Sequence, residues 1–496
     1  MKINLTLSGP FLTTKILDPQ RLGGTSGNIS LLRAAYIDVQ GRLSNCLSEA
    51  EPGWKRFGGA AEADTDYDGK SYSGSAIFPE RLAECMLSNV QIAEAVNQWT
   101  VDASARKFSD GAVCGLTVSS GTLTFDRCTI SIHDFGVGIV EIDVTFAGLG
   151  TVTVGDIRSE MEALTVSFAS LSSLLAGQRL KTFLRCLDQF PDVGRIFTTM
   201  SPGTSGQYSN SRPKVLWIHR IYLVNGNNWL GTDDALAALL LVQHHTNGCE
   251  NASIDPTISL YPSIGGSVAF AKEGQDQGSL GFGDALKSTV SLQNAYNAGI
   301  WMFDDILFGR TVELMGEQDQ IVFDNVKLEG LMSHAHSILR LSSYISTFLS
   351  VLHNRTSRSS PQQLILTEKI YDAWRMELQR AALESKLAVL KEMYQVTLRL
   401  LADAEARALN KLLFWFTLLS LVTATTTVAD FIVKMEEFRF SGWRLSLVIG
   451  SAAVVYFAVL AVRKFKHLSA MRHLNDNADV IDRAIRISTE PYRGKD

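Results

Sequence analysis

Two long apolar stretches dominate the hydrophobic pattern near the C-terminal end of the chain. They are LLFWFTLLSLVTATTTVADFIV at residues 412–433 and LSLVIGSAAVVYFAVLAV at residues 445–462. As helices they would have about 22 residues (roughly 33 Å) and about 18 residues, enough to cross a bilayer. Both are apolar on every face, which favours membrane spans over the alternative, a buried hairpin in a soluble domain. We therefore predict two transmembrane helices over residues 411–463.

The region before the first span has no helix breakers. Between Pro361 and Gly442 there is neither glycine nor proline, which predicts one uninterrupted helix. Residues spaced by alternating steps of four and three form a heptad seam, typical of a coiled coil or a helical bundle. This seam comprises Leu383, Leu387, Leu390, Tyr394, Thr397, Leu401, Ala404 and Ala408.

The seam narrows to alanine beside the first span, so we predict an inner stalk constriction at Ala404 and Ala408. Residues 328–353 also have a helical pattern, and together these segments predict a helical stalk over residues 320–410. A two-helix hairpin within a monomer is the alternative explanation of the seam.

The first 310 residues have a different pattern. Residues 115–146 are rich in β-branched side chains and interrupted by SSG and FGVG, which predicts several antiparallel strands. We expect helices at 154–176 and 233–245, and strands at 214–224 and 311–317. The predicted fold class is α+β: a mixed N-terminal regulatory domain over residues 1–310, then the long stalk helix and the two-helix transmembrane hairpin.

Charge and cysteine content narrow the class of protein. The chain has 46 Lys+Arg and 51 Asp+Glu, a net charge of -5, so no whole-chain basic signature indicates a nucleic-acid partner. The N-terminus lacks the apolar core of a secretory signal, and the cysteines form no CxxC pair. We therefore expect a cytosolic N-terminal domain with reduced, buried cysteines; the six are Cys46, Cys85, Cys114, Cys128, Cys186 and Cys249.

Lysine and arginine near the span ends predict the orientation in the membrane. Arg399, Arg407 and Lys411 precede the first span, and a basic cluster within residues 463–472 follows the second. Basic residues of the connecting loop are offset by acidic neighbours. We expect an integral protein of the bacterial inner (plasma) membrane with both termini in the cytoplasm, including a tail over residues 464–496.

Several short motifs lack a residue or a spacing that their function requires. Residues 64–75 open like a calcium loop, but Ser75 stands where an EF-hand needs a bidentate glutamate. The glycines of GSLGFG are in the wrong order for a dinucleotide loop, and no complete phosphate loop occurs. The histidines lack metal-ligand spacing. We therefore predict neither an enzyme nor a bound metal or cofactor.

Polar residues follow one face of the first span. Thr423, Thr426, Thr427 and Asp430 are spaced i, i+3, i+4 and i+7, so they share a helix face. A charge inside a span usually faces a bundle interior or water. In a symmetric oligomer each residue becomes a ring, and acidic rings select cations. These residues predict a pore lining; alternatively, the threonines pack helix on helix and Asp430 reaches the outer surface.

A mixed cytosolic domain, a long stalk helix running into the first span, a short loop and a second span resemble the CorA family of divalent-cation channels. The resemblance covers the stalk and the hairpin. It implies a homopentamer whose first span lines the pore and ends in a Gly-Met-Asn signature at the pore mouth. Lys434, Met435 and Glu436 stand there in this sequence. Only the methionine matches, and Glu436 replaces the asparagine that would hold a hydrated magnesium ion.

The resemblance implies a homo-oligomeric channel that conducts cations and is gated by the cytosolic domain. A divalent cation such as magnesium would be the permeant or regulatory ion, and a small-molecule ligand of the N-terminal domain would be the gating signal. CorA-like proteins without the signature include effectors linked to phage defence, so a gated effector that depolarises the membrane is one alternative. A non-conducting, membrane-anchored sensor or scaffold is the other.

Overall fold

The computed structural model describes residues 2–18, 21, 29–57, 81–102, 115–118, 121–148, 154–199, 213–225, 258–263, 265–271, 276–323, 328–353 and 361–435. The chain divides into two compact units. The sheet unit comprises Met1–Arg310 and Leu339–Glu384, and the span unit comprises Thr311–Ile338 and Ser385–Asp496. The second predicted span, at residues 445–462, lies outside the described residues.

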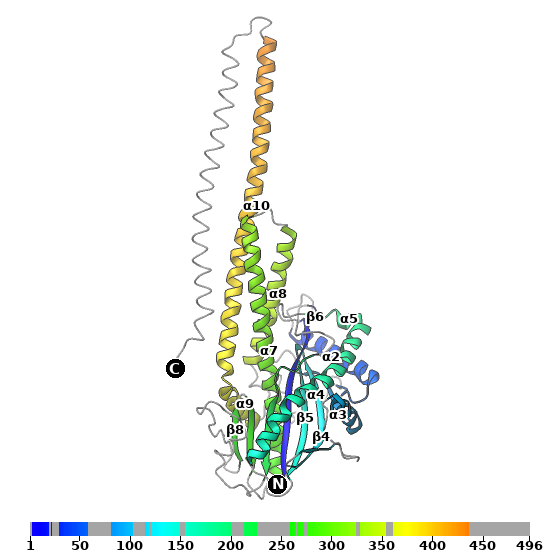
Figure 1. Cartoon of the computed structure of the whole chain (residues 1–496). Helices are drawn as coiled ribbons and strands as arrows, with labels where there is room; N and C mark the ends of the chain where they lie inside the picture. The colour runs from blue at the N-terminus through cyan, green and yellow to red at the C-terminus, as the bar shows by residue number, and fades with distance from the viewer. Residues whose placement is uncertain are drawn as a thin grey trace, which may run out of the picture. The chain divides into compact units, whose positions relative to one another are not determined.

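A nine-stranded mixed sheet forms the centre of the sheet unit (Figure 1). Its order is β2-β4-β5-β1-β7-β9-β8, with β3 added to β4 and β6 added to β1. Neighbouring strands are antiparallel except for the parallel pair β7 and β9. The strands are β1 Lys2–Leu17, β2 Arg81–Leu87, β3 Gly115–Val118, β4 Gly121–His133, β5 Phe135–Gly148, β6 Phe197–Thr199, β7 His219–Asn225, β8 Ile258–Ser263 and β9 Gly266–Ala271.

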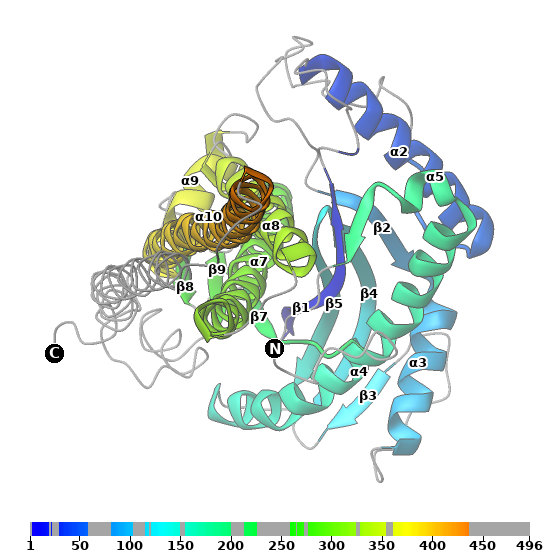
Figure 2. The ribbon, with the colours of Figure 1, turned by 90° about the horizontal axis from the view of Figure 1, so that it is seen from above.

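Helices cover both faces of this sheet (Figure 2). On one face lie α2 (Ile29–Ala50), α3 (Asn89–Asp102) and α4 (Val154–Gln189), followed by the single turn α5 (Pro191–Gly194). On the other face lies the first part of α7 (Asp276–Phe323), whose side chains bond to β1 and β5. Helices on both faces bury the two sides of the central strand β1, including its polar residues Thr6 and Ser8.

Close contact between β1 and β5 depends on a glycine. Phe11 of β1 pairs with Gly138 of β5, and a β-carbon on Gly138 would overlap the ring of Phe11. Phe11 itself is fully buried. Glycine is therefore the residue that lets the aromatic ring cross the neighbouring strand here.

Several predicted elements are confirmed. The strands expected within 115–146 are β3, β4 and β5, and the helix expected at 154–176 is the first part of α4. The helix expected at 328–353 is α8 (Leu328–His353) with the same bounds. The strand expected at 214–224 begins later, as β7 at His219. The helix expected at 233–245 lies outside the described residues.

The strand predicted at residues 311–317 is wrong, because this segment lies inside α7. Its alternation of apolar and polar residues is too short to separate a strand from a turn of helix, and α7 is 48 residues long. The single helix predicted from Pro361 is also wrong at one point. It divides into α9 (Pro361–Ala373) and α10 (Met376–Met435).

The break falls at Trp374 and Arg375, where no glycine or proline occurs. Arg375 has a φ of 52°, in the left-handed region, which costs a non-glycine residue roughly 1–2 kcal/mol. Trp374 is fully buried and packs against the ring of His219 in β7. Packing of this indole in the core therefore overrides the local preference for a continuous helix.

Candidate functional site on helix α10

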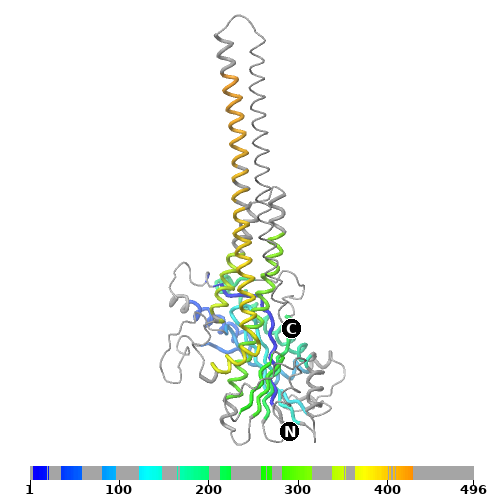
Figure 3. Tube along the Cα trace, turned by 90° about the vertical axis from the view of Figure 1, so that its left-hand side faces the viewer, coloured from blue at the N-terminus to red at the C-terminus, as the bar shows by residue number. Residues whose placement is uncertain are grey.

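Helix α10 is a single helix of 60 residues, shown from yellow to orange in Figure 3. Its segment Leu409–Thr427 is long and apolar enough to cross a membrane, and none of that apolar stretch is buried within the chain. Large apolar side chains on it are exposed to solvent: Leu409, Leu412, Leu413, Trp415, Phe416, Leu419, Leu421 and Val422.

This exposure is costly in water. Fully burying one such side chain stabilises a protein by about 1.5–3 kcal/mol. These eight side chains are mostly near 60% exposed, so the chain lacks on the order of 10 kcal/mol of the stabilisation that burying them would give. Soluble monomers rarely expose a continuous apolar surface of this extent. The described part of the chain provides no cover for this segment.

The threonine hydroxyls in this segment bond to their own helix. Thr423 Oγ1 donates to the carbonyl of Leu419 at 2.8 Å, and Thr427 Oγ1 donates to the carbonyl of Thr423 at 2.7 Å. Thr417, Thr425 and Thr426 bond in the same way, three or four residues back. Each hydroxyl proton thus has an acceptor without a partner helix or water, which makes these threonines tolerable in lipid.

The structure places the predicted pore residues only in part. Thr423, Thr426 and Thr427 are exposed on α10. Asp430, Lys434 and Met435 belong to the same helix, as do Ala404 and Ala408, but the description covers only the backbone of these five. Glu436 lies outside the described residues. The roles assigned to these six residues and to the three threonines remain predictions.

The described part of the heptad seam, from Leu383 to Thr397, is covered within one chain. Leu383, Leu387, Leu390 and Thr397 are buried, and Met393 is buried beside the half-buried Tyr394. A seam that is reserved for contacts between copies would be exposed in a single chain. At these positions the seam is therefore filled within one copy, and both explanations of the seam remain predictions.

Pattern reasoning missed a polar layer between α7 and the sheet. Asp143 of β5 accepts a hydrogen bond from Thr6 Oγ1 at 2.5 Å and lies 3.1 Å from Lys287 Nζ of α7. Asn294 Nδ2 donates to Ser8 Oγ at 3.1 Å, and Asn294 Oδ1 accepts from Trp217 Nε1 at 2.7 Å. These bonds fix the register of α7 against β1 and β5.

Several buried ionisable groups of the sheet unit have shifted pKa values. Desolvation raises the pKa of Glu141, against the opposing effects of Arg81 and of a hydrogen bond with Ser291. Burial raises the pKa of Cys85 and that of Cys186 to about 12. These two thiols are protonated at neutral pH, so neither is an activated nucleophile.

A second polar cluster lies at the end of β1. Asp18 is almost completely buried, and its carboxylate lies 3.2 Å from Arg21 Nε. Tyr344 of α8 shares a hydrogen bond of 3.1 Å with Thr198 of β6. Burial raises the pKa of Tyr344. The cluster fastens α8 to the sheet, and a nearby residue of β1, Thr14, has a positive φ of 57°.

Within the described residues, no group of three or more His, Cys, Asp or Glu side chains could hold a metal ion. Comparison of the chain with protein-family models, curated proteins and solved structures gives no match. Function is therefore inferred from the geometry of the chain itself.

Proposed function

We propose that the chain is a membrane protein in which α10 crosses the bilayer and copies of the chain form a cation channel gated by the N-terminal domain. The observation that carries this proposal is the exposed apolar surface of Leu409–Thr427. A core helix of a soluble protein has the same composition but is mostly buried. Lipid supplies the missing cover, with residues 445–462 as the second helix of the hairpin.

The basic residues and the tryptophan near the start of this surface support one orientation of α10 in the membrane. Arg399 and Arg407 are exposed on the N-terminal side of Leu409–Thr427, Lys411 is exposed within its first turn, and Trp415 lies one turn after Lys411. Basic residues mark the cytoplasmic side and tryptophan is enriched at the interface. This arrangement supports an inner-membrane protein with its N-terminal domain in the cytoplasm.

The face that carries Thr423, Thr426, Thr427 and Asp430 supports a pore. The threonine protons are bonded within the helix, so their oxygen lone pairs remain available to a passing cation. In a CorA-like homopentamer, Asp430 would form an acidic ring and residues 434–436 the mouth. Ala404 and Ala408 would line the inner stalk, and magnesium or another divalent cation would permeate.

The same hydrogen bonds also support a second candidate function. Threonines whose protons are satisfied by their own helix need no aqueous pore. A membrane-anchored sensor that conducts nothing fits this observation equally well. A gated effector differs from the transporter only in selectivity, because it would depolarise the membrane rather than pass one divalent ion.

Oligomer mass in detergent and cation flux into liposomes test the proposal on the purified full-length chain. Asp430→Asn removes the charge from the predicted pore, and Asp284→Asn removes an exposed charge from α7 as a matched control. We expect an oligomer that conducts, with rate or selectivity lost several-fold in the first variant only. Magnesium flux indicates transport, and unselective flux indicates a depolarising effector. A monomer that conducts nothing supports the anchor and refutes the channel.

A further inference from the structure

The break between α9 and α10 is anchored to the core of the sheet unit. Trp374 lies at the break, and its ring centroid is 4.8 Å from that of His219. His219 is itself fully buried, with Nε2 3.2 Å from Ser267 Oγ of β9. The bend in the chain is thereby tied to two strands of the sheet.

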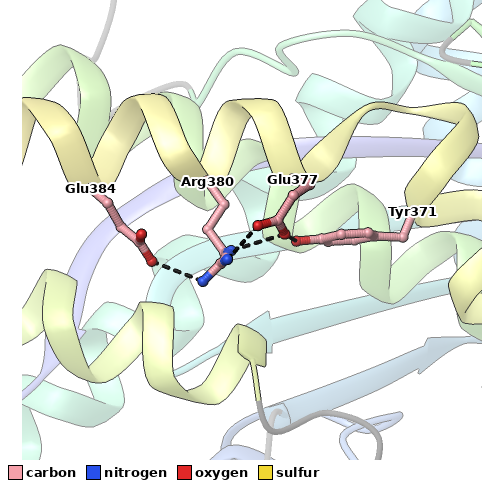
Figure 4. Close-up of polar contacts among 4 residues, drawn as sticks. All are labelled: Tyr371, Glu377, Arg380 and Glu384. Carbon is pink, nitrogen blue, oxygen red and sulfur yellow. Dashed lines mark hydrogen bonds and ion pairs between the residues drawn. The ribbon is translucent and has the colours of Figure 1, made fainter.

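A polar brace also joins the two helices across the break (Figure 4). The hydroxyl of Tyr371, at the end of α9, donates to Glu377 Oε2 at 2.8 Å. Arg380 donates to the same carboxylate through Nε at 3.1 Å. Its Nη1 donates to Glu384 Oε1 at 2.9 Å. The brace ends at Glu384, the last residue of the sheet unit before α10 continues into the span unit.

The bent arrangement carries local costs. Arg375 is held in the left-handed region. Among the described residues, the buried atoms Trp374 Nε1 and Gln379 Oε1 have no hydrogen-bond partner, and unpaired buried polar atoms are unfavourable. No glycine or proline after Pro361 interrupts the helical sequence up to Met435. Local preference therefore opposes the bend, while tertiary packing and the brace support it.

We propose that this break is a two-state joint that regulates the span. In the bent state Trp374 packs on His219 and Tyr371 is bonded to Glu377. In the straight state α9 and α10 form one helix and Arg375 adopts helical geometry. The effect on conduction rests on the proposed channel function, whereas the conformational change does not.

Distance measurements between spin labels test the joint in the full-length protein in nanodiscs. Ketone-bearing residues at the exposed positions 368 and 388 carry the labels and leave the six cysteines in place. In one continuous helix their Cα atoms would be about 30 Å apart. We expect this distance as a minor population in the wild type, distinct from the bent one.

Two variants shift these populations in opposite directions. Arg375→Gly removes the cost of the left-handed backbone and disfavours the helix, so the straight population should fall on the order of tenfold. Tyr371→Phe combined with Arg375→Ala removes one bond of the brace and favours the helix, so the straight population should rise by a similar factor. Glu392→Gln, on an exposed carboxylate of α10 outside the brace, is the matched control and should change neither.

Flux through the same variants in liposomes separates the two proposals. We expect Arg375→Gly and the double variant to change cation flux in opposite directions. Identical distance distributions in all variants would show a rigid bend and overturn the joint, even if the wild type conducts. Shifted distributions in proteins that never conduct would retain the joint and overturn the channel.

Discussion

Leu419 provides the sharpest test of the membrane span. It lies near the centre of Leu409–Thr427 and its side chain is 65% exposed in the chain. Replacing it with arginine therefore removes little packing within the protein. At the centre of a span, however, the change from leucine to arginine costs about 3 kcal/mol, since leucine contributes roughly -0.5 and arginine at least +2.5 kcal/mol. That difference lowers the insertion equilibrium by about 100-fold.

The assay is resistance to alkaline extraction from isolated membranes. We expect wild-type chain to stay in the membrane pellet, and Leu419→Arg to lose a large fraction to the supernatant or to fail to accumulate. Leu378→Arg is the matched control, because Leu378 is 64% exposed on the same helix but lies outside the apolar segment. Equal extraction of the two variants, or a wild type that is soluble without detergent, would refute the assignment of α10 as a span.

Three further predictions concern the sheet unit. A methyl group on Gly138 would overlap the ring of Phe11, so Gly138→Ala should lower the free energy of unfolding by about 1–3 kcal/mol in denaturant titration. Cys85 and Cys186, with pKa values raised to about 12, should resist iodoacetamide at pH 8 until the chain is unfolded; rapid labelling of the folded chain would contradict their burial. Because the pKa of Glu141 is raised above 4.5 by burial, its contribution to stability is lost as pH rises through the folded-state value. Glu141→Gln should therefore stabilise the protein more at pH 7 than at pH 4, and an equal effect at both values would contradict that shift.

Side-chain type and turn residues predicted the strands within 115–146, and a helical pattern predicted α8. Strand β1 was not predicted, because both of its faces are buried. Its polar residues Thr6 and Ser8 lie in the core with its leucines, so no contrast between an inner and an outer face appears in the sequence.

The break at Arg375 and the polar layer under α7 could not be predicted for a different reason. Both depend on contacts between residues far apart in the chain, such as Trp374 with His219 and Lys287 with Asp143. A local window contains only one member of each pair. The apolar stretch Leu409–Thr427, in contrast, was recognisable from composition alone. In the proposed membrane setting, lipid is a uniform solvent that selects composition over about 20 residues without regard to specific partners.

Because part of the heptad seam is buried within one chain, packing of the stalk and assembly of copies use different surfaces. Leu383 and Leu390 are buried in a single copy, whereas Leu398 is 41% exposed and Leu409 is 60% exposed further along α10. Apolar cover supplied by the chain itself therefore decreases along the helix toward Leu409–Thr427. In the proposed channel, contacts between copies cannot use the buried part of the seam without unpacking the chain that already fills it. Assembly then falls to the surfaces that remain exposed, and the pore is formed where the chain leaves its own helix uncovered.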